Sequence, residues 1–292
     1  MIETKGRIPE GWSLLGKALF SVQYSAETSA RYEANLAEAE LKHRENPSDE
    51  AAIVWHGRRL GYLTRYREAI DVYSEGLTRY PDSFILLRHR GHRYISVRRF
   101  AEAEADFSRA AKLCLATPDT MEEDGEPNKA GIPTGTVRFN IFYHLALAKY
   151  LQGRFEDALV DYRTCMDYST MNNDALVATS DWLYMTLKRL GRDGEADEVL
   201  VPIIGDMELI ENYAYYHRLL LYKGLKKPEE LMSAGSTTHH DTATHGYGIG
   251  NWHLYNGRKE EAKAMFETIV ATSFWPAFGF IAAEAELSRG IF

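Results

Sequence analysis

Residues 50–83 read EAAIVWHGRRLGYLTRYREAIDVYSEGLTRYPDS, and residues 84–117, FILLRHRGHRYISVRRFAEAEADFSRAAKLCLAT, repeat their pattern after 34 positions. Ala69 is followed at this distance by Ala103, and Tyr73 by Phe107. A period of this length with apolar residues at helical spacing is typical of stacked helix pairs. Each pair buries its apolar face only against its neighbours, so the repetition predicts the architecture and leaves the function to the side chains on the shared surface.

The composition excludes several classes of protein. Of the 292 residues 45% are hydrophobic and 26% are charged, and the formal net charge is −8. A negative net charge offers no attraction to phosphates, which argues against nucleic acid as a partner. No apolar run approaches the roughly 20 residues that a transmembrane helix needs. We expect a cytoplasmic protein with no transmembrane segment and two buried free thiols, Cys114 and Cys165; a leader peptide that has been removed is the alternative for its location.

The repeated positions resemble those of the tetratricopeptide repeat (TPR) family. In that family small and aromatic residues recur at fixed places, because small residues let helices approach closely and aromatic rings fill the space between pairs. The matching residues are Gly57, Tyr66, Ala69, Tyr73, Gly76 and Pro81 in the first unit; Gly91, Phe100, Ala103, Phe107 and Ala110 in the second; Ala146, Phe155, Ala158, Tyr162 and Cys165 in the third; Gly191 and Ala196 in a weaker fourth; and Gly250, Gly257, Ala262 and Phe266 in the last.

The resemblance implies an all-α fold, a right-handed superhelical solenoid of stacked antiparallel helix pairs. We expect an N-terminal extension over residues 1–22 and one continuous repeat domain over residues 23–292. An excess of 21 residues between the second and third units predicts a loop insertion over 117–137, and insertions of this length are often functional lids or binding loops. The expected units lie at about 50–83, 84–117, 139–172, 177–210 and 243–276, with a degenerate unit at 211–242 and a capping helix at 275–288.

The resemblance also implies a concave groove lined by the first helix of each pair. The family's groove positions, carried onto this chain, hold aromatic side chains together with arginine, histidine and asparagine. Arginine matches carboxylates and phosphates in a bidentate geometry, so this lining favours an anionic or carboxylate-bearing ligand. The predicted groove residues are Trp55, Arg58, Tyr62, Arg88, His89, His92, Asn140, Tyr143, His144, Tyr150, Trp182, Arg189, Tyr247 and Asn251.

Three functions are compatible with this groove. The favoured one is a non-enzymatic scaffold that binds a protein or peptide segment. The second is a small-molecule or enzymatic site formed by the same Tyr, His and Trp side chains and closed by the 117–137 loop, although no catalytic constellation is found. The third is structural: the aromatic residues pack between helices, and terminal segments of the chain, such as residues 11–20, fill the groove.

Local motifs for cofactors and metals are weak. Gly11, Gly16 and Lys17 match part of a phosphate-binding loop, but the Ser or Thr that would hold magnesium is absent, and no strand can precede the motif. Three histidines and an aspartate within residues 239–245 lie in an expected surface loop, which seldom gives the fixed geometry of a metal site. The acidic residues within 122–126 lack the spacing of a calcium loop. We therefore expect no cofactor and no metal.

Overall fold

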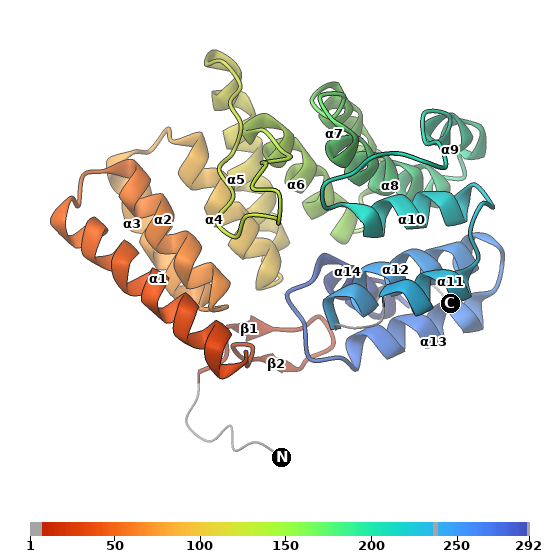
Figure 1. The fold of residues 1–292 in the computed structure, drawn as a ribbon, viewed down its shortest axis with the longest axis horizontal. Helices are drawn as coiled ribbons and strands as arrows, with labels where there is room; N and C mark the ends of the chain where they lie inside the picture. The colour runs from red at the N-terminus through yellow and green to blue at the C-terminus, as the bar shows by residue number, and fades with distance from the viewer. Residues whose placement is uncertain (1–7, 236–238, 291–292) are drawn as a thin grey trace. The chain divides into compact units, whose positions relative to one another are not determined.

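The structure is a computed structural model, and it describes residues 8–235 and 239–290. These residues form fourteen α-helices, one short 3-10 helix and one two-stranded sheet, so the expected all-α class is confirmed (Figure 1). The chain divides into two compact units, residues 1–116 (unit 1) and 117–292 (unit 2). The sequence predicts a single continuous domain over residues 23–292. The division falls where the insertion interrupts the succession of helix pairs.

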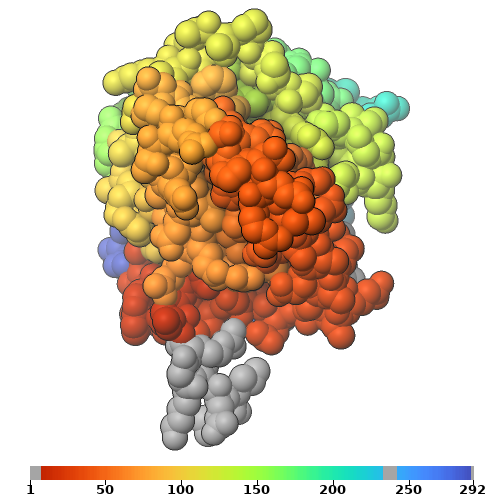
Figure 2. Space-filling view, turned by 90° about the vertical axis from the view of Figure 1, so that its left-hand side faces the viewer, coloured from red at the N-terminus to blue at the C-terminus, as the bar shows by residue number. Residues whose placement is uncertain are grey.

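Unit 1 begins with a β-hairpin and continues with five helices. Strands β1 (Gly11–Trp12) and β2 (Ala18–Leu19) are antiparallel. The helices pack in chain order, so that α2 with α3 and α4 with α5 form two helix pairs. Figure 2 shows α1, in orange-red, on the surface of this unit, and most of its residues are exposed. The helices are α1 (Ala26–Glu45), α2 (Glu50–Tyr62), α3 (Tyr66–Arg79), α4 (Phe84–Ser96) and α5 (Phe100–Leu113), followed by a 3-10 turn (Cys114–Ala116).

Unit 2 contains nine helices among its described residues. They are α6 (Val137–Leu151), α7 (Phe155–Asp167), α8 (Asn173–Arg189), α9 (Asp193–Leu200), α10 (Tyr213–Tyr222), α11 (Pro228–Gly235), α12 (His239–Tyr255), α13 (Lys259–Val270) and α14 (Phe278–Arg289). Pairs form between α6 and α7, α8 and α9, and α12 and α13. The last helix, α14, packs on α12 and α13 and also reaches α6, while α12 contacts α8. The first helices of successive pairs therefore converge, and the inner side of unit 2 is closed by its own chain.

Contacts between a glycine and an aromatic ring join the two helices of a pair. In three pairs, a Cβ atom added to the glycine of the first helix would collide with the ring of the second helix, so only glycine permits this approach. Both residues of each contact belong to the repeated positions of the sequence. The contacts are Gly57 with Tyr73, Gly91 with Phe107 and Gly250 with Phe266.

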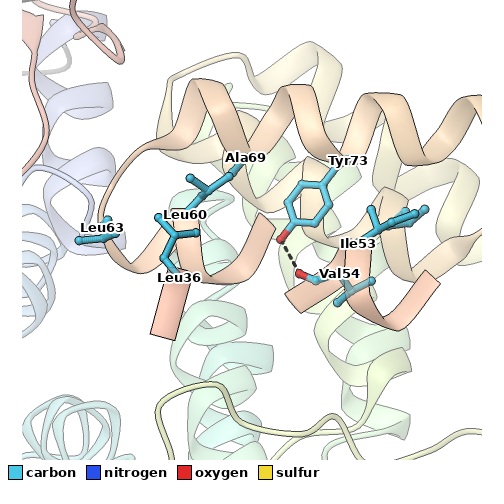
Figure 3. Close-up of a cluster of buried hydrophobic side chains, with 8 residues drawn as sticks. Leu36, Ile53, Val54, Leu60, Leu63, Ala69 and Tyr73 are labelled. Atoms are coloured by element: carbon cyan, nitrogen blue, oxygen red, sulfur yellow. Dashed lines mark hydrogen bonds between the residues drawn. The ribbon is translucent and has the colours of Figure 1, made fainter. Parts of the chain in front are cut away.

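Tyr73 lies at the centre of the core of unit 1. Figure 3 shows its ring among aliphatic side chains of α2, with Leu36 of α1 in the same cluster. The Tyr73 hydroxyl donates a hydrogen bond of 3.5 Å to the carbonyl oxygen of Val54. Because the hydroxyl has this partner, the ring can be buried completely without leaving an unsatisfied polar group.

The turn inside each helix pair places one residue in the left-handed region. In unit 2 this residue is a glycine, with φ of 77° at Gly153, 69° at Gly191 and 73° at Gly257. In unit 1 the same place holds Thr64, with φ of 55°, and Arg98, with φ of 66°. A residue with a Cβ atom loses about 1 to 2 kcal/mol in this conformation. The two turns of unit 1 are therefore strained where those of unit 2 are not.

The insertion over residues 117–137 is fixed to unit 2 by hydrogen bonds. Asn128 Nδ2 and Thr134 Oγ1 donate to the carboxylate of Glu211, at 3.2 and 2.5 Å. Asn172 Nδ2, at the start of α8, donates to the Thr134 carbonyl oxygen at 3.0 Å. These bonds join the loop to α8 and to the segment before α10.

Candidate functional site

The predicted groove residues divide between the two units, and each set is described within its own unit. In unit 1, Trp55, Arg58 and Tyr62 lie along α2 and are partly exposed. The guanidinium of Arg58 stacks over the Trp55 ring, with its central carbon 4.5 Å from the ring centroid, and Arg59 approaches the same ring at 4.9 Å. Tryptophan is the most favourable ring for a cation–π contact, and an arginine stacked on a ring can still donate hydrogen bonds from its guanidinium edge.

The α4 residues of this set are less accessible. Arg88 and His89 are buried, and Arg88 Nη1 lies 3.1 Å from His89 Nδ1. The His89 ring stacks on the Tyr73 ring with centroids 5.9 Å apart. His92 is partly exposed. The accessible part of the predicted groove in unit 1 is therefore made by α2 and by His92, and we call Trp55, Arg58, Tyr62 and His92 the α2 face.

Arginine dominates the segment that builds the α2 face. Residues 55–99 contain ten arginines and no lysine, against four Asp and Glu residues. Residues 1–116 carry 18 Lys and Arg and 16 Asp and Glu, a net charge of +2, whereas residues 117–292 carry 16 and 26, a net charge of −10. Among residues 8–235 and 239–290, no carboxylate forms an ion pair with Arg58. The α2 face is thus accessible and carries the Arg58 guanidinium. It also lies in the part of the chain that has a net positive charge.

In unit 2 the predicted groove residues at the centre of the unit are buried. Tyr150, Trp182, Tyr247 and Asn251 have at most 1% of their surface exposed. Trp182 contacts both tyrosine rings, with centroids 5.2 Å from Tyr150 and 5.7 Å from Tyr247. The Tyr247 hydroxyl donates to the Tyr150 hydroxyl at 2.9 Å, and Asn251 Nδ2 donates to the Tyr247 carbonyl oxygen at 3.1 Å. Burial raises the pKa of both phenols. In this conformation the four side chains contact one another and not solvent.

Arg189 binds a carboxylate, and the carboxylate comes from the same unit. Its Nη1 lies 2.7 Å from Glu286 Oε2 on α14, and Arg289 Nη2 lies 2.7 Å from Glu286 Oε1. The Tyr247 hydroxyl lies 3.2 Å from the same Oε1. Burial lowers the pKa of Arg189, but the Glu286 carboxylate outweighs this effect and the pKa is raised overall. Glu286 thus occupies the position that the sequence analysis gives to an anionic ligand.

A second buried ion pair lies beside this network. Arg218 of α10 pairs with Asp181 of α8, and its Nε lies 2.9 Å from Asp181 Oδ1. Its Nη1 donates to the Thr244 carbonyl oxygen at 2.8 Å. Both side chains of the pair are almost completely inaccessible. The sequence pattern also places Asp181 at a groove position, but sequence reasoning missed Arg218 and Glu286, because the helices that carry them are far apart in the chain and meet only when unit 2 closes.

The remaining predicted groove residues, on α6, also make internal contacts. Asn140 Nδ2 donates to Glu122 Oε2 of the insertion at 3.1 Å. The Tyr143 hydroxyl donates to the Tyr215 hydroxyl at 3.3 Å. The His144 ring packs edge-on against Phe278 of α14, with centroids 5.5 Å apart. These contacts tie α6 to the insertion, to α10 and to α14.

Several chemical alternatives can be placed in the structure. The glycines and lysine of the apparent phosphate-binding loop belong to the β1–β2 hairpin, which is not a strand–loop–helix unit. Burial raises the pKa of the Cys165 thiol to about 12, so it is not a nucleophile near neutral pH. In the part of the chain that the structure describes, no group of three or more His, Cys, Asp or Glu side chains is arranged to hold a metal ion. The side chains of residues 239–241, part of the histidine cluster, lie outside the described residues.

None of the helices in the part of the chain that the structure describes combines the length and the apolar composition that a bilayer crossing requires.

Comparison with known proteins gives the fold. No protein-family model and no curated protein matches the sequence. Among solved structures, a tetratricopeptide repeat protein from Parabacteroides merdae superposes with a TM-score of 0.50 at 15% identity, over 89% of this chain and 93% of that one. YrrB, described as a TPR protein with an unusual peptide-binding site, gives 0.42 at 15% identity over 80% and 91%. MamA gives 0.42 at 13% identity over 67% and 90%. The helix pairs, their repeated contacts and the Parabacteroides structure together show that this chain has a TPR-like helical-repeat fold.

Proposed function

We propose that this protein is a protein-interaction scaffold that binds an anionic peptide or protein segment on the α2 face of unit 1. The observation that carries the proposal is the Arg58 guanidinium, which is partly exposed, stacked on Trp55, and without a carboxylate partner among the described residues. Its edge is available for a bidentate pair with an incoming carboxylate. We keep the cytoplasm as the expected location.

The neighbouring side chains suit the same ligand. Tyr62 and Trp55 offer large rigid surfaces with a polar edge, a combination that is enriched in residues that dominate binding energy. His92 adds a donor on the adjacent helix. Unit 2 supports the choice of ligand by analogy, because its inner arginine, Arg189, pairs with the Glu286 carboxylate, which also accepts a hydrogen bond from the Tyr247 hydroxyl.

The test is a selection of displayed random peptides against the full chain and against two charge-reversed variants. Arg58→Glu reverses the charge on the α2 face, and Arg79→Glu makes the same change at an exposed position on α3. We expect enriched peptides to contain Asp or Glu, to lose at least about tenfold in affinity with Arg58→Glu and to bind normally to Arg79→Glu. Equal loss of affinity in the two variants would mean that peptide binding depends only on the net charge of the protein, which would contradict a specific site.

The enzymatic or small-molecule alternative predicts a different outcome. The native protein would retain a metabolite through purification, detectable by mass spectrometry after denaturation, and no displayed peptide would be enriched. That result would make the histidines of α4 the candidates for the small-molecule site.

A further inference from the structure

The β-hairpin of unit 1 is seated on the turns between its helices. The Val22 N–H donates to Thr64 Oγ1 at 2.8 Å, in the turn between α2 and α3. Gly11 lies against Val97, at the turn between α4 and α5, so closely that an added Cβ would lie 3.1 Å from Val97 Cβ and 3.2 Å from its carbonyl oxygen. These contacts place the hairpin at the turns and not along the α2 face.

Glu10 fixes the hairpin to α3. Its Oε2 accepts the backbone N–H of Arg67 at 3.0 Å, in the first turn of α3, and its Oε1 accepts the Ser21 hydroxyl at 3.2 Å. Since α3 has no cap from its own N-cap side chain, Glu10 supplies an acceptor to one of the N–H groups that a helix start leaves open. The carboxylate of Glu10 is therefore already engaged.

A cleft of about 610 Å³ opens between the hairpin and the helices. Its apolar walls come from Ile8, Trp12 and Leu14 on one side and from Ile70 and Val97 on the other. Trp12 is 62% exposed and Ile8 is 71% exposed. A tryptophan held open to solvent at the edge of a cleft of this size is the arrangement of a binding anchor, because large exposed apolar groups lose free energy unless a partner covers them.

The rim of the cleft is basic. Arg67, Arg98 and Arg99 line it, against Glu10 and Asp71. The Glu10 carboxylate is engaged with Ser21 and with the start of α3. Arg98 is buried and donates to the Ser96 carbonyl oxygen, and Arg99 pairs with Glu102, so the exposed Arg67 is the rim arginine whose guanidinium can meet a carboxylate from outside. The cleft complements a segment that carries an apolar side chain next to a carboxylate.

The backbone beside the cleft is strained. Two non-glycine residues among the described residues have positive φ, Thr64 and Arg98. Thr64 accepts the hydrogen bond from Val22, and Arg98 lines the cleft. Such outliers persist where the surrounding structure holds them, and they concentrate at binding sites.

We propose that the hairpin cleft is a second interaction site, separate from the α2 face, which binds a short acidic peptide segment through insertion of one apolar side chain beside Trp12. The carboxylate of the segment pairs with Arg67 at the rim. A concave cleft favours a peptide over a lipid surface, which a protruding apolar group would contact without a cavity. The net positive charge of residues 1–116 favours an acidic partner.

The experiment measures fluorescence anisotropy of two labelled peptides with the full chain. Both peptides contain a Leu-Phe core, flanked by Asp and Glu in one and by Lys in the other. Trp12→Ala and Arg67→Glu are the site variants; both positions are exposed, and a glutamate in the first turn of α3 suits the helix dipole, so both variants are expected to fold. Leu115→Ala and Arg79→Glu are matched exposed controls elsewhere in unit 1.

We expect the acidic peptide to bind and the basic one not to bind. Trp12→Ala and Arg67→Glu should each weaken binding at least about tenfold, while Leu115→Ala, Arg79→Glu and the α2-face variant Arg58→Glu leave it unchanged. Binding that Arg58→Glu removes and Trp12→Ala does not would assign the peptide to the α2 face and overturn the cleft. Equal binding of both peptides, or no binding, would also overturn it.

Two other occupants of the cleft, a lipid surface and a second copy of the chain, can be distinguished by experiment. Sedimentation of anionic vesicles with the protein, lost in Trp12→Ala, would assign Trp12 to a lipid surface. A concentration-dependent dimer that Trp12→Ala dissociates would assign it to a second copy of the chain. Either result would overturn the proposal.

Discussion

The sequence places Arg58 in unit 1 and Arg189 in unit 2 at groove positions of the same kind, yet the two side chains have opposite surroundings. Arg58 stacks on Trp55 at the surface and has no carboxylate partner among the described residues. Arg189 is mostly buried and holds Glu286 of the same unit. The comparison teaches that an arginine at a groove position indicates a carboxylate partner. Whether the same chain supplies this carboxylate, as in unit 2, depends on which other helices pack nearby.

The largest expected effect concerns the buried pair of unit 2. Asp181→Ala leaves the Arg218 guanidinium buried without its carboxylate, and we expect a loss of about 3 to 5 kcal/mol in the free energy of unfolding. Asp106→Ala breaks the pair with Arg90 in unit 1. The Arg90 side chain is 20% exposed and can be hydrated, so the loss of stability should be smaller. Urea unfolding measures both variants. Equal losses of stability would contradict the burial of the Asp181–Arg218 pair inside unit 2. The double variant Asp181→Leu with Arg218→Met should recover most of the stability.

The next effect tests the carboxylate on α14. Glu286→Gln keeps the shape of the side chain and removes its charge from two arginines, and we expect unit 2 to lose about 2 to 3 kcal/mol. Glu267→Gln makes the same change at an exposed position of α13 and should be nearly neutral. The readout is thermal unfolding together with amide hydrogen exchange in α14. Unchanged exchange in α14 would show that Glu286 does not hold the helix in place.

A smaller effect should follow pH in unit 1. His43 Nδ1 and His56 Nδ1 lie 2.9 Å apart and join α1 to α2. Burial and then the charge of His43 lower the pKa of His56, while Glu40 opposes the shift. The folded state therefore binds the proton less well than the unfolded state, so this contribution to stability is present above the unfolded pKa of about 6.5 and declines as the pH falls. We expect faster amide exchange in α1 at pH about 5 than at about 7, and a weaker pH dependence in His56→Asn. Identical exchange of α1 at both pH values would contradict the coupling.

The smallest effect compares the turns. Gly153→Ala forces a Cβ atom into a left-handed position and should destabilise unit 2 by about 1 kcal/mol. Thr64→Gly relieves the corresponding strain in unit 1 but also removes the hydrogen bond from Val22, so the two changes offset each other and the net effect should stay below about 0.5 kcal/mol. Denaturant midpoints resolve the difference. A large stabilisation by Thr64→Gly would mean that the bond from Val22 adds little.

The local part of the fold follows from the sequence because its contacts are repeated. The contact of Gly57 with Tyr73 joins adjacent helices, and the same spacing recurs in Gly91 with Phe107, so the 34-residue period predicts it. The closure of unit 2 does not follow in this way. Tyr247 and Glu286 meet Tyr150 and Arg189 across helices that are distant in the chain, and periodicity in a repeat protein describes neighbours alone. The predicted groove therefore included residues that belong to the interior.

The hairpin shows a second limit of sequence reasoning. In the sequence, Gly11, Gly16 and Lys17 match part of a phosphate-binding loop, and the structural alternative places residues 11–20 in the groove. Gly16 instead forms the hairpin turn with φ of 77°, and Gly11 permits the close seat on Val97. A glycine required by a contact with a distant turn has the same appearance in the sequence as one required by a ligand.

The absence of lysine between residues 55 and 99 has a consequence for regulation and for experiment. Acetylation acts on lysine amines, so it cannot remove the positive charge of this segment, and the guanidinium groups stay protonated at every pH that a cell reaches. Lysine acetylation within this segment therefore cannot control a partner that binds here. In the laboratory, amine-reactive dyes and surface supports would attach elsewhere on the chain and leave the α2 face chemically intact.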